Sequence, residues 1–364
     1  MNVKYYFLVV LLLPLLSSCV KKTVQPASTI ITPKYDVYIS GYVDTVSNTQ
    51  TLPAYWKNSA LSVVGAGYYD ASVNDITVGT LGTVYMAGSK LVAIGSKPPY
   101  RLVNVATYWI NGKPVRLVSD TTHDSSASKI AVYSNNIYVI GSTHNDSIPQ
   151  PVLWKNGLAE PLTFSSPAVG GQATAIALSG NDIYIAGNAY TKDYYGMAVY
   201  WKNGQQVALS EPNSTTTVNA IAVNGSDVYV AGQISNYVTA IATYWKNGVA
   251  HSLSTDTIDS RISSLIINNN DVYIAGKAAL VKNQQTNNLT YGFIYWKNGV
   301  IGNADWTKNT TTYNSVTVSN IGIGYPDVYA AGTFNNRAVY WLNGKMAPLY
   351  NSISGASGIF IQPH

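Results

Sequence analysis

The chain has 364 residues, a formal net charge of +5, only 11% charged residues and a single cysteine. Nucleic-acid-binding proteins gather basic residues into a stripe, and no run of Lys and Arg here exceeds the pair Lys21-Lys22, so nucleic acid is not an expected partner. One cysteine excludes an intrachain disulfide, and the frequent Val, Ile, Thr and Tyr favour β-strands.

Residues 1–18 have the pattern of an export signal peptide. Lys4 supplies the early positive charge, and residues 5–16 form an apolar stretch shorter than the roughly 20 residues of a membrane-spanning helix. The stretch ends in Leu16-Ser17-Ser18-Cys19, which resembles the lipobox of bacterial lipoproteins. The resemblance implies a diacylglycerol on the Cys19 sulfur, cleavage before Cys19 and acylation of the new amine.

A lipoprotein of this kind would be anchored in the bacterial cell envelope, at the outer membrane or cell surface, with its acyl chains in the lipid bilayer. Residues 19–34 are then expected to be a lipidated tether, and residues 35–364 a single domain. An unmodified thiol beside an ordinary cleavage site is the alternative.

Two short phrases alternate seven times along residues 35–364. The first is Asp-Val-Tyr-x-Ala-Gly with close variants, and the second is Tyr-Trp-Lys-Asn-Gly with close variants. Their tyrosines and tryptophans are Tyr38, Tyr85, Tyr138, Tyr184, Tyr229, Tyr273 and Tyr329, and Trp56, Trp109, Trp154, Trp201, Trp245, Trp296 and Trp341. A period of about 40–50 residues built from strands is typical of a propeller blade. The sequence therefore predicts an all-β, seven-bladed β-propeller.

The copy at residues 218–253 predicts a blade of four antiparallel strands, because its apolar segments lack a helical period. The expected strands are 218–224, 227–232, 242–246 and 251–253. Asn247-Gly248 joins the last two, and both residues tolerate the positive φ angles of a type I′ hairpin turn.

Each second strand ends in glycine, and five begin with aspartate (Asp36, Asp182, Asp227, Asp271 and Asp327). A side chain at the glycines is expected to obstruct the neighbouring blade or the turn. The aspartates invite a catalytic or calcium interpretation, but the chain has no Asp-x-Asp-x-Asp loop, so we expect them to close turns by bonding their own backbone. The repeated Trp and Tyr are expected to pack blade against blade, and neither a metal nor a cofactor is expected.

The order of phrases, an apolar strand, a Tyr strand ending in Gly and a Trp strand, resembles the Kelch repeat. Kelch blades have a Gly pair after the second strand, whereas this chain has Ala-Gly or Ser-Gly. The pattern Ala-x-Tyr-Trp-x-Asn-Gly is similar to bacterial extracellular repeats of the HAF type. The resemblance covers about residues 36–362 and implies a propeller without transferring any catalytic residue.

The two ends of the repeat region complement each other. Tyr35–Gly41 is a second strand with no first strand before it, and Ala356–Ile361 is a first strand with no second strand after it. Pairing them would complete a blade and cover two open sheet edges. We therefore expect the C-terminal strand to close the ring on the N-terminal blade.

Antiparallel strands place the 2–3 and 4–1 connections of every blade on one side, where the segments 89–105, 188–197, 277–292 and 303–314 are expected to form long irregular loops. Variable loops on a rigid frame often bind ligands, and tyrosine, present 29 times, suits a contact surface. The candidate binding residues are Tyr100, Arg101, Tyr190, Tyr194, Tyr195, Tyr237, Tyr291, Trp306 and Tyr313.

The expected function is a monomeric, membrane-anchored binding module for a protein or glycan, and not an enzyme. Tyrosines that merely cover the small cores of their own loops are a simpler alternative. A carbohydrate-active lyase or hydrolase with its site at the channel mouth is a further one, because blades can bring distant carboxylates together. The loop carboxylates available to it are Asp70, Asp124, Asp146, Asp193, Asp256 and Asp259.

Overall fold

The computed structural model describes residues 35–44, 51–65, 71–95, 97, 99–118, 122–144, 148–193, 196–212, 214–236, 238–255, 257–282, 289–302 and 316–363. Tyr35–His364 form one compact unit. Cys19, the expected signal peptide and the expected tether lie outside the described residues.

The described strands form seven four-stranded antiparallel sheets, numbered here as blades 1 to 7 in chain order. The strands of each blade are given from the innermost outward. Blade 1 consists of β28 (Ser354–Pro363), β1 (Tyr35–Asp44), β2 (Thr51–Lys57) and β3 (Ala60–Val63), and blade 2 of β4 (Ala71–Val78), β5 (Val84–Ile94), β6 (Arg101–Ile110) and β7 (Lys113–Arg116). Blade 3 consists of β8 (Ser125–Tyr133), β9 (Asn136–Thr143), β10 (Gln150–Lys155) and β11 (Leu158–Pro161), and blade 4 of β12 (Ala168–Ser179), β13 (Asp182–Thr191), β14 (Gly196–Lys202) and β15 (Gln205–Ala208). Blades 5 to 7 are β16 (Thr216–Asn224), β17 (Asp227–Ser235), β18 (Ala240–Lys246), β19 (Val249–Ser252); β20 (Ser260–Asn268), β21 (Asp271–Lys282), β22 (Leu289–Lys297), β23 (Val300–Ile301); and β24 (Val316–Gly324), β25 (Asp327–Phe334), β26 (Arg337–Leu342), β27 (Lys345–Pro348). One 3₁₀ turn, Thr80–Gly82, joins β4 to β5.

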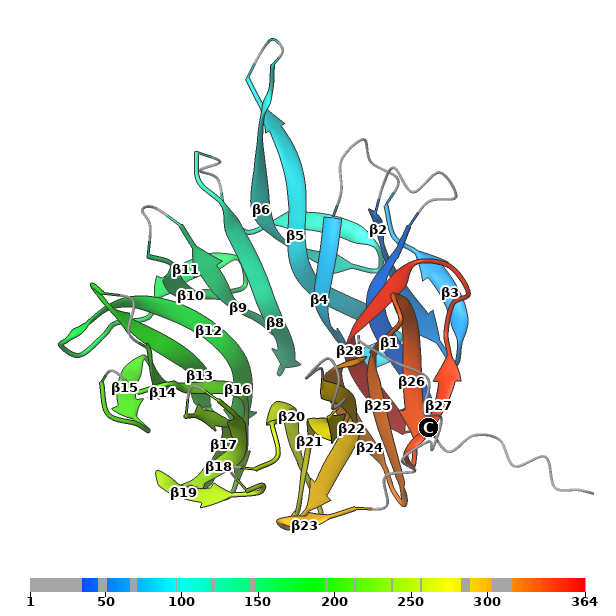
Figure 1. Ribbon diagram of the computed structural model, residues 1–364. Coiled ribbons are helices and arrows are strands. Elements are labelled where there is room, and N and C mark those ends of the chain that lie inside the picture. Colours follow the sequence, from blue (N-terminus) through cyan, green and yellow to red (C-terminus); the bar gives the residue numbers. More distant parts are fainter. Residues whose placement is uncertain are drawn as a thin grey trace, which may run out of the picture. The chain divides into compact units, whose positions relative to one another are not determined.

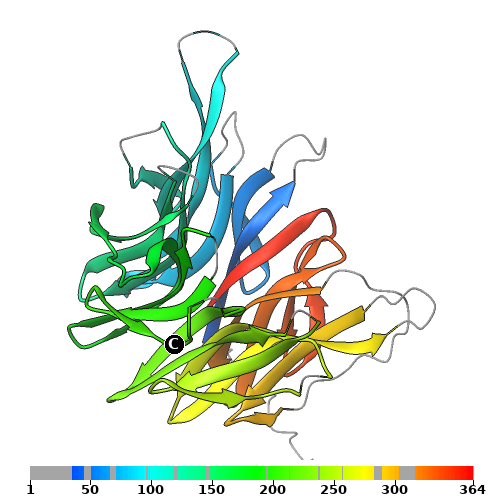
Figure 2. The same ribbon diagram turned by 60° about the vertical axis from the view of Figure 1, so that its left-hand side comes forward.

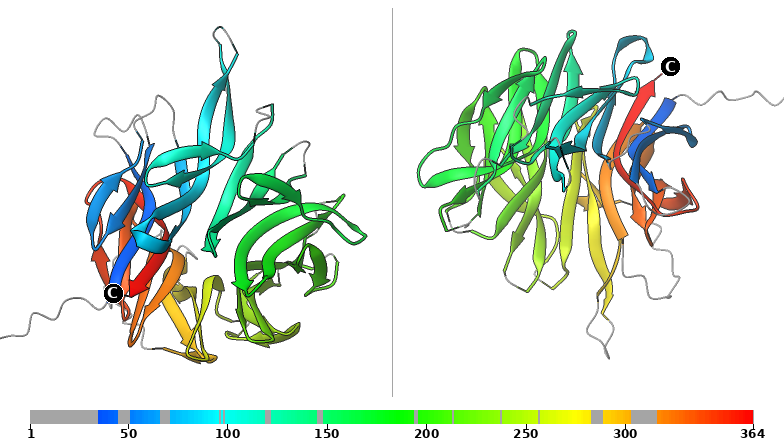
Figure 3. Two further views of the ribbon diagram at one scale, coloured as in Figure 1. Left: turned by 180° about the vertical axis from the view of Figure 1, so that it is seen from behind. Right: turned by 90° about the horizontal axis from the view of Figure 1, so that it is seen from above.

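The predicted all-β, seven-bladed propeller is confirmed. The innermost strands of successive blades contact one another around the whole ring, and the sheets follow each other about a common axis (Figures 1 and 3). The expected type I′ turn is also present, with φ of 51° at Asn247 and 84° at Gly248.

The predicted closure is confirmed as well. The C-terminal strand β28 pairs with β1, with Ile359 opposite Ile39 and Phe360 opposite Tyr38 (Figure 2). Ile359 is 5% exposed and packs in one cluster with Trp56, beside Ala331 and Ala338 of blade 7. The last strand of the chain therefore supplies the innermost strand of the first blade.

A β-bulge interrupts every innermost strand opposite the glycine of the second strand, which corrects the expected role of these glycines. A Cβ atom on Gly232 would lie well under 3.0 Å from the carbonyl oxygen of Thr217, inside the same blade. The same clash within the blade would occur at Gly41, Gly88, Gly141, Gly187, Gly276 and Gly332. Glycine is thus required because the bulged backbone approaches too closely for a side chain.

The bulged residues are all small and polar: Asn74, Ser128, Thr174, Asn219, Ser263, Ser319 and Ser357. Asn219 Nδ2 donates to the carbonyl oxygen of Ile262 in the next blade at 2.7 Å. Equivalent interblade bonds run from Asn74, Thr174, Ser319 and Ser357 to Ala127, Val218, Ala356 and Val73. These side chains join the innermost strands of neighbouring blades, so the bulge is part of the ring's construction.

The repeated tryptophans are buried between blades, as expected. Trp201 is 0% exposed, packs against Ile140 and Leu153 of blade 3, and donates its Nε1–H to the carbonyl oxygen of Thr163 at 2.7 Å. Packing of this kind at each blade interface explains why the residue recurs in every copy.

The repeated aspartates belong to a clip between two turns, a role that the expected bond to their own backbone did not include. Asp227 Oδ1 accepts a hydrogen bond from Asn247 Nδ2 at 2.8 Å, and its Oδ2 pairs with Lys246 Nζ at 2.8 Å. Asn247 Oδ1 accepts from the Val228 N–H, and Lys246 lies over the Tyr229 ring. Equivalent aspartate–asparagine bonds occur at Asp36, Asp182, Asp271 and Asp327. Both repeated phrases therefore contribute residues to this clip, which joins the second and third strands on the side of the tight turns.

Candidate functional site

The side of the ring that carries the 2–3 and 4–1 connections, called the loop side here, lies opposite the tight turns. Of the predicted binding residues, Tyr194, Tyr195, Tyr237, Trp306 and Tyr313 lie outside the described residues. Tyr100, Arg101, Tyr190 and Tyr291 are described. Arg101, Tyr190 and Tyr291 lie in paired strands, and Tyr100 directly precedes the first residue of β6.

Three segments expected to be irregular are largely extensions of regular hairpins. β5 and β6 remain paired as far as Ile94 and Arg101, β13 pairs with β14 as far as Tyr190 and Gly196, and β21 continues to Lys282. The fourth segment, 303–314, lies outside the described residues. The ladder of hydrogen bonds in these hairpins continues beyond the repeated phrases.

The β5–β6 hairpin projects farther than its neighbours on the loop side (Figure 1). Its end carries Tyr100, which is 45% exposed, followed by exposed Arg101 and by Leu102, which is 49% exposed. A cation and an aliphatic side chain are thus presented by the paired backbone, and an aromatic ring directly precedes them.

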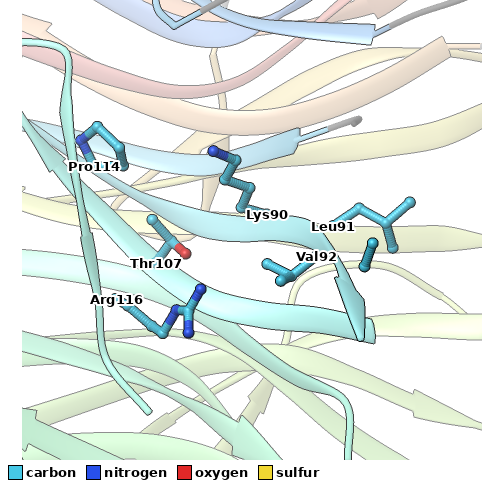
Figure 4. A pocket seen from close by; sticks show the side chains of 7 residues that line it. Lys90, Leu91, Val92, Thr107, Pro114 and Arg116 are labelled. Atoms are coloured by element: carbon cyan, nitrogen blue, oxygen red, sulfur yellow. The ribbon is translucent and has the colours of Figure 1, made fainter. Parts of the chain in front are cut away.

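A hollow of about 410 Å³ lies along the same blade (Figure 4). Lys90, Thr107 and Arg116 contribute polar groups to it, and Leu91 and Val92 contribute apolar ones. Two cations beside a hydroxyl group make this hollow suited to an anionic or hydrogen-bonding ligand.

The two inner strands of each blade present a facing pair of residues near the loop side, just before the bulge and just after the glycine. Six pairs are uncharged: Gly355 with Tyr42, Ser72 with Ser89, Ser126 with Ser142, Gln172 with Asn188, Thr217 with Gln233, and Thr317 with Thr333. The remaining pair, in blade 6, is Arg261 with Lys277. The loop side therefore has a polar inner ring in which a single blade carries charge, and both charges are positive.

Around the blade 6 pair, Asp259 and Tyr291 complete a cluster. The Tyr291 hydroxyl donates to the Asp259 carboxylate, Arg261 Nε lies 3.3 Å from the same oxygen, and the Ala240 N–H of blade 5 donates to the other oxygen at 2.7 Å. Lys277 Nζ lies 4.8 Å from the centre of the Tyr291 ring, a cation–π contact. Asp259 is only 4% exposed, whereas the Arg261 side chain is 53% exposed.

The ionisation of this cluster follows from burial and contacts. Burial opposes ionisation of Asp259, but the hydrogen bonds from Tyr291 and Ala240 and the charge of Arg261 outweigh it and lower its pKa. Burial, and then the bond to Asp259, raises the pKa of Tyr291 to about 12. Burial, and then Arg261, lowers the pKa of Lys277. At neutral pH the cluster holds one anion and two cations, with Tyr291 a neutral donor.

Two of the three described loop carboxylates, Asp124 and Asp259, accept hydrogen bonds from backbone N–H groups. Asp124 Oδ1 accepts from the Asn104 N–H at 2.7 Å, and Asp259 accepts from Ala240. Tyr190 is half-buried, and burial raises its pKa. These contacts give Asp124 and Asp259 a structural role whatever else they do. Asp193 is the third described loop carboxylate, and Asp70, Asp146 and Asp256 lie outside the described residues.

Within the described residues, no three His, Cys, Asp or Glu side chains come together in a way that could hold a metal ion. Nor does that part of the chain contain a helix long and apolar enough to span a membrane.

The sequence matches no protein-family model and no curated protein sequence. Its fold is similar to solved propellers. An acylaminoacyl peptidase from Pyrococcus horikoshii has a TM-score of 0.50 at 10% identity, over 88% of this chain and 51% of that one. The β-propeller domain of the Trilobed protease from Pyrococcus furiosus has a TM-score of 0.47 at 8% identity, over 86% and 92%. A polysaccharide lyase of the PL25 family, an ulvan lyase, has a TM-score of 0.44 at 11% identity, over 78% and 81%. Identities this low show the propeller fold alone.

Proposed function

We propose that the protein is a lipid-anchored, extracytoplasmic binding module of the bacterial cell envelope that presents its loop side to a protein or glycan partner. Anchoring through Cys19 rests on the lipobox-like residues 16–19, which follow an apolar stretch of signal-peptide length. The binding role rests chiefly on the exposed end of the β5–β6 hairpin.

Tyr100, Arg101 and Leu102 are the residue types expected at a contact surface. Tyrosine combines a large apolar face with one hydrogen-bonding tip and loses little entropy on binding, and arginine adds a planar set of donors. The paired strands that hold Arg101 and Leu102 limit how much of the surface must be ordered when a partner binds. A rigid hairpin that projects an aromatic ring and a cation is therefore better suited to recognition than to packing within the ring.

A carbohydrate-active enzyme is a second candidate because Asp259, Tyr291 and Arg261 form a hydrogen-bonded cluster on the loop side. A general base works best with a pKa near the working pH. The pKa of Tyr291 is raised to about 12, and Asp259 already accepts three donors. Both properties favour a binding role for this cluster over proton abstraction.

The domain of residues 35–364 can be tested separately, because every hydrophobic core cluster of the described chain lies within it. We would screen it against immobilised glycans and envelope-protein extracts, and compare Tyr100→Ala with Tyr133→Ala. Tyr133 is 48% exposed but lies at the end of β8 on the turn side, so it is a matched control.

If the hairpin contacts the partner as a hot spot, Tyr100→Ala should weaken binding about tenfold or more, and Tyr133→Ala should leave it unchanged. Equal losses in both variants would contradict a role for the loop side. Turnover of a glycan that Asp259→Asn or Tyr291→Phe abolishes would favour the enzyme.

A further inference from the structure

We propose that Arg261 and Lys277 form a subsite for a carboxylate group of an acidic polysaccharide, one built from uronic acids. This inference rests on the proposed binding function, and it names the ligand class. The strands concerned, β20, β21 and β22, are adjacent in blade 6 (Figure 1).

Without a ligand, the arrangement of the two cations is unfavourable. Arg261 and Lys277 face each other directly across two antiparallel strands, where like charges are destabilising. The carboxylate that acts on both cations is that of Asp259, which is bonded to Arg261 and buried. The cluster retains one net positive charge that an arriving anion would neutralise.

The other six blades differ from blade 6 at this position. Each of them carries an uncharged pair at the same register, for example Thr217 with Gln233 in blade 5. The fold therefore does not require charge at this position, and two cations stand in blade 6 for a reason other than packing. Arg261, with a side chain 53% exposed, can still offer the guanidinium nitrogens that Asp259 does not occupy.

The chemical groups of the cation pair and of the equivalent pairs in the two neighbouring blades indicate the class of ligand. The guanidinium group binds a carboxylate through paired N–H donors, and Lys277 adds a point charge. In the neighbouring blades the equivalent pairs, Thr217 with Gln233 and Thr317 with Thr333, carry hydroxyl and amide groups, which match sugar hydroxyls. A polypeptide partner would instead favour apolar pockets for its anchoring side chains. The surroundings thus suit a hydroxyl-rich polymer with a carboxylate at one position.

The test uses the domain of residues 35–364 and measures binding of polygalacturonate, dextran and poly-glutamate by titration calorimetry. The variant Arg261→Thr/Lys277→Gln gives blade 6 the residues that blade 5 already has. The control Lys113→Gln/Lys345→Gln removes the same charge from exposed positions at tight turns on the opposite side. Because Arg261 also contacts Asp259, the single variant Lys277→Gln and a thermal unfolding curve for each protein separate binding from stability.

We expect polygalacturonate to bind, dextran to bind at least tenfold more weakly, and added salt to weaken the complex. The double variant should lose at least tenfold in affinity while its thermal unfolding curve still shows a folded domain, Lys277→Gln should lose part of the affinity, and the control should lose none. Tighter binding of poly-glutamate through the same two residues would overturn the proposal in favour of an acidic peptide. Tight binding of a neutral glycan or an envelope protein, with the same affinity for the double variant, would overturn the proposal while leaving the binding function intact. If the domain binds no ligand in the calorimetry and none in the screen of glycans and envelope-protein extracts, this proposal and the proposed binding function both fail.

Discussion

Closure of the ring by the last strand can be tested with one pair of substitutions. Ile359 of β28 and Ile221 of β16 occupy equivalent positions, because each lies two residues after the bulged residue of its strand. Each is 5% exposed. β16 belongs to a blade built from one continuous stretch of chain, whereas β28 is joined to its blade only by pairing with β1. The Ile221→Ala variant is therefore a matched control for Ile359→Ala.

Truncating a buried isoleucine to alanine costs about 2–5 kcal/mol, through lost transfer free energy and the cavity that remains. A domain is stable by about 5–15 kcal/mol, so either variant should remain folded but unfold at clearly lower urea concentration. If β28 is held as firmly as β16, both losses should fall within this range of about 2–5 kcal/mol, since the two sites are equally buried.

Equilibrium urea unfolding, followed by tryptophan fluorescence and far-ultraviolet circular dichroism, would measure both free energies of unfolding. Trp56 lies in the same cluster as Ile359 and reports on the closing blade. A loss below about 1 kcal/mol for Ile359→Ala beside a loss of about 2–5 kcal/mol for Ile221→Ala would refute closure, because a frayed strand contributes nothing to stability.

Three further outcomes are expected. Gly232→Ala should destabilise the domain strongly, because its Cβ would meet the Thr217 backbone, whereas Gly196→Ala should be nearly neutral in urea unfolding because its nearest neighbour would lie 3.8 Å away. The hydrogen bond from Lys246, and then that from Asn247, lowers the pKa of Asp227, so its contribution to stability is present above the ordinary pKa of 3.8 and is lost as pH falls through the lower value of the folded state. The urea midpoints of Asp227→Asn and the unchanged protein should therefore differ at neutral pH and converge in strong acid, and a constant gap would contradict the linkage. Cys19→Ser should abolish fatty-acid labelling and release the protein from membranes or leave the precursor uncleaved, and a cleaved, unlabelled and still membrane-bound variant would exclude lipidation.

The sequence by itself determined the architecture, because the properties that specify it are local and repeat. A type I′ hairpin turn requires positive φ at two successive residues, and Asn247 and Gly248 both tolerate it. These two residues alone therefore specify the turn. The two phrases that contain Tyr229 and Trp245 alternate seven times along the chain and specify the blade, and the unmatched strands at the two ends specify the closure.

The tertiary structure decided which polar groups meet. The Asp227–Asn247 clip and the close approach of Gly232 to its own blade depend on strand register and on the bulge, and sequence periodicity shows neither. Arg261 and Lys277 look unremarkable in the sequence, and become a cation pair only because the bulge sets them opposite each other in the one blade without an uncharged pair. A bulge changes the register by one residue, so the identity of facing side chains is a property of the paired strands and not of either strand alone.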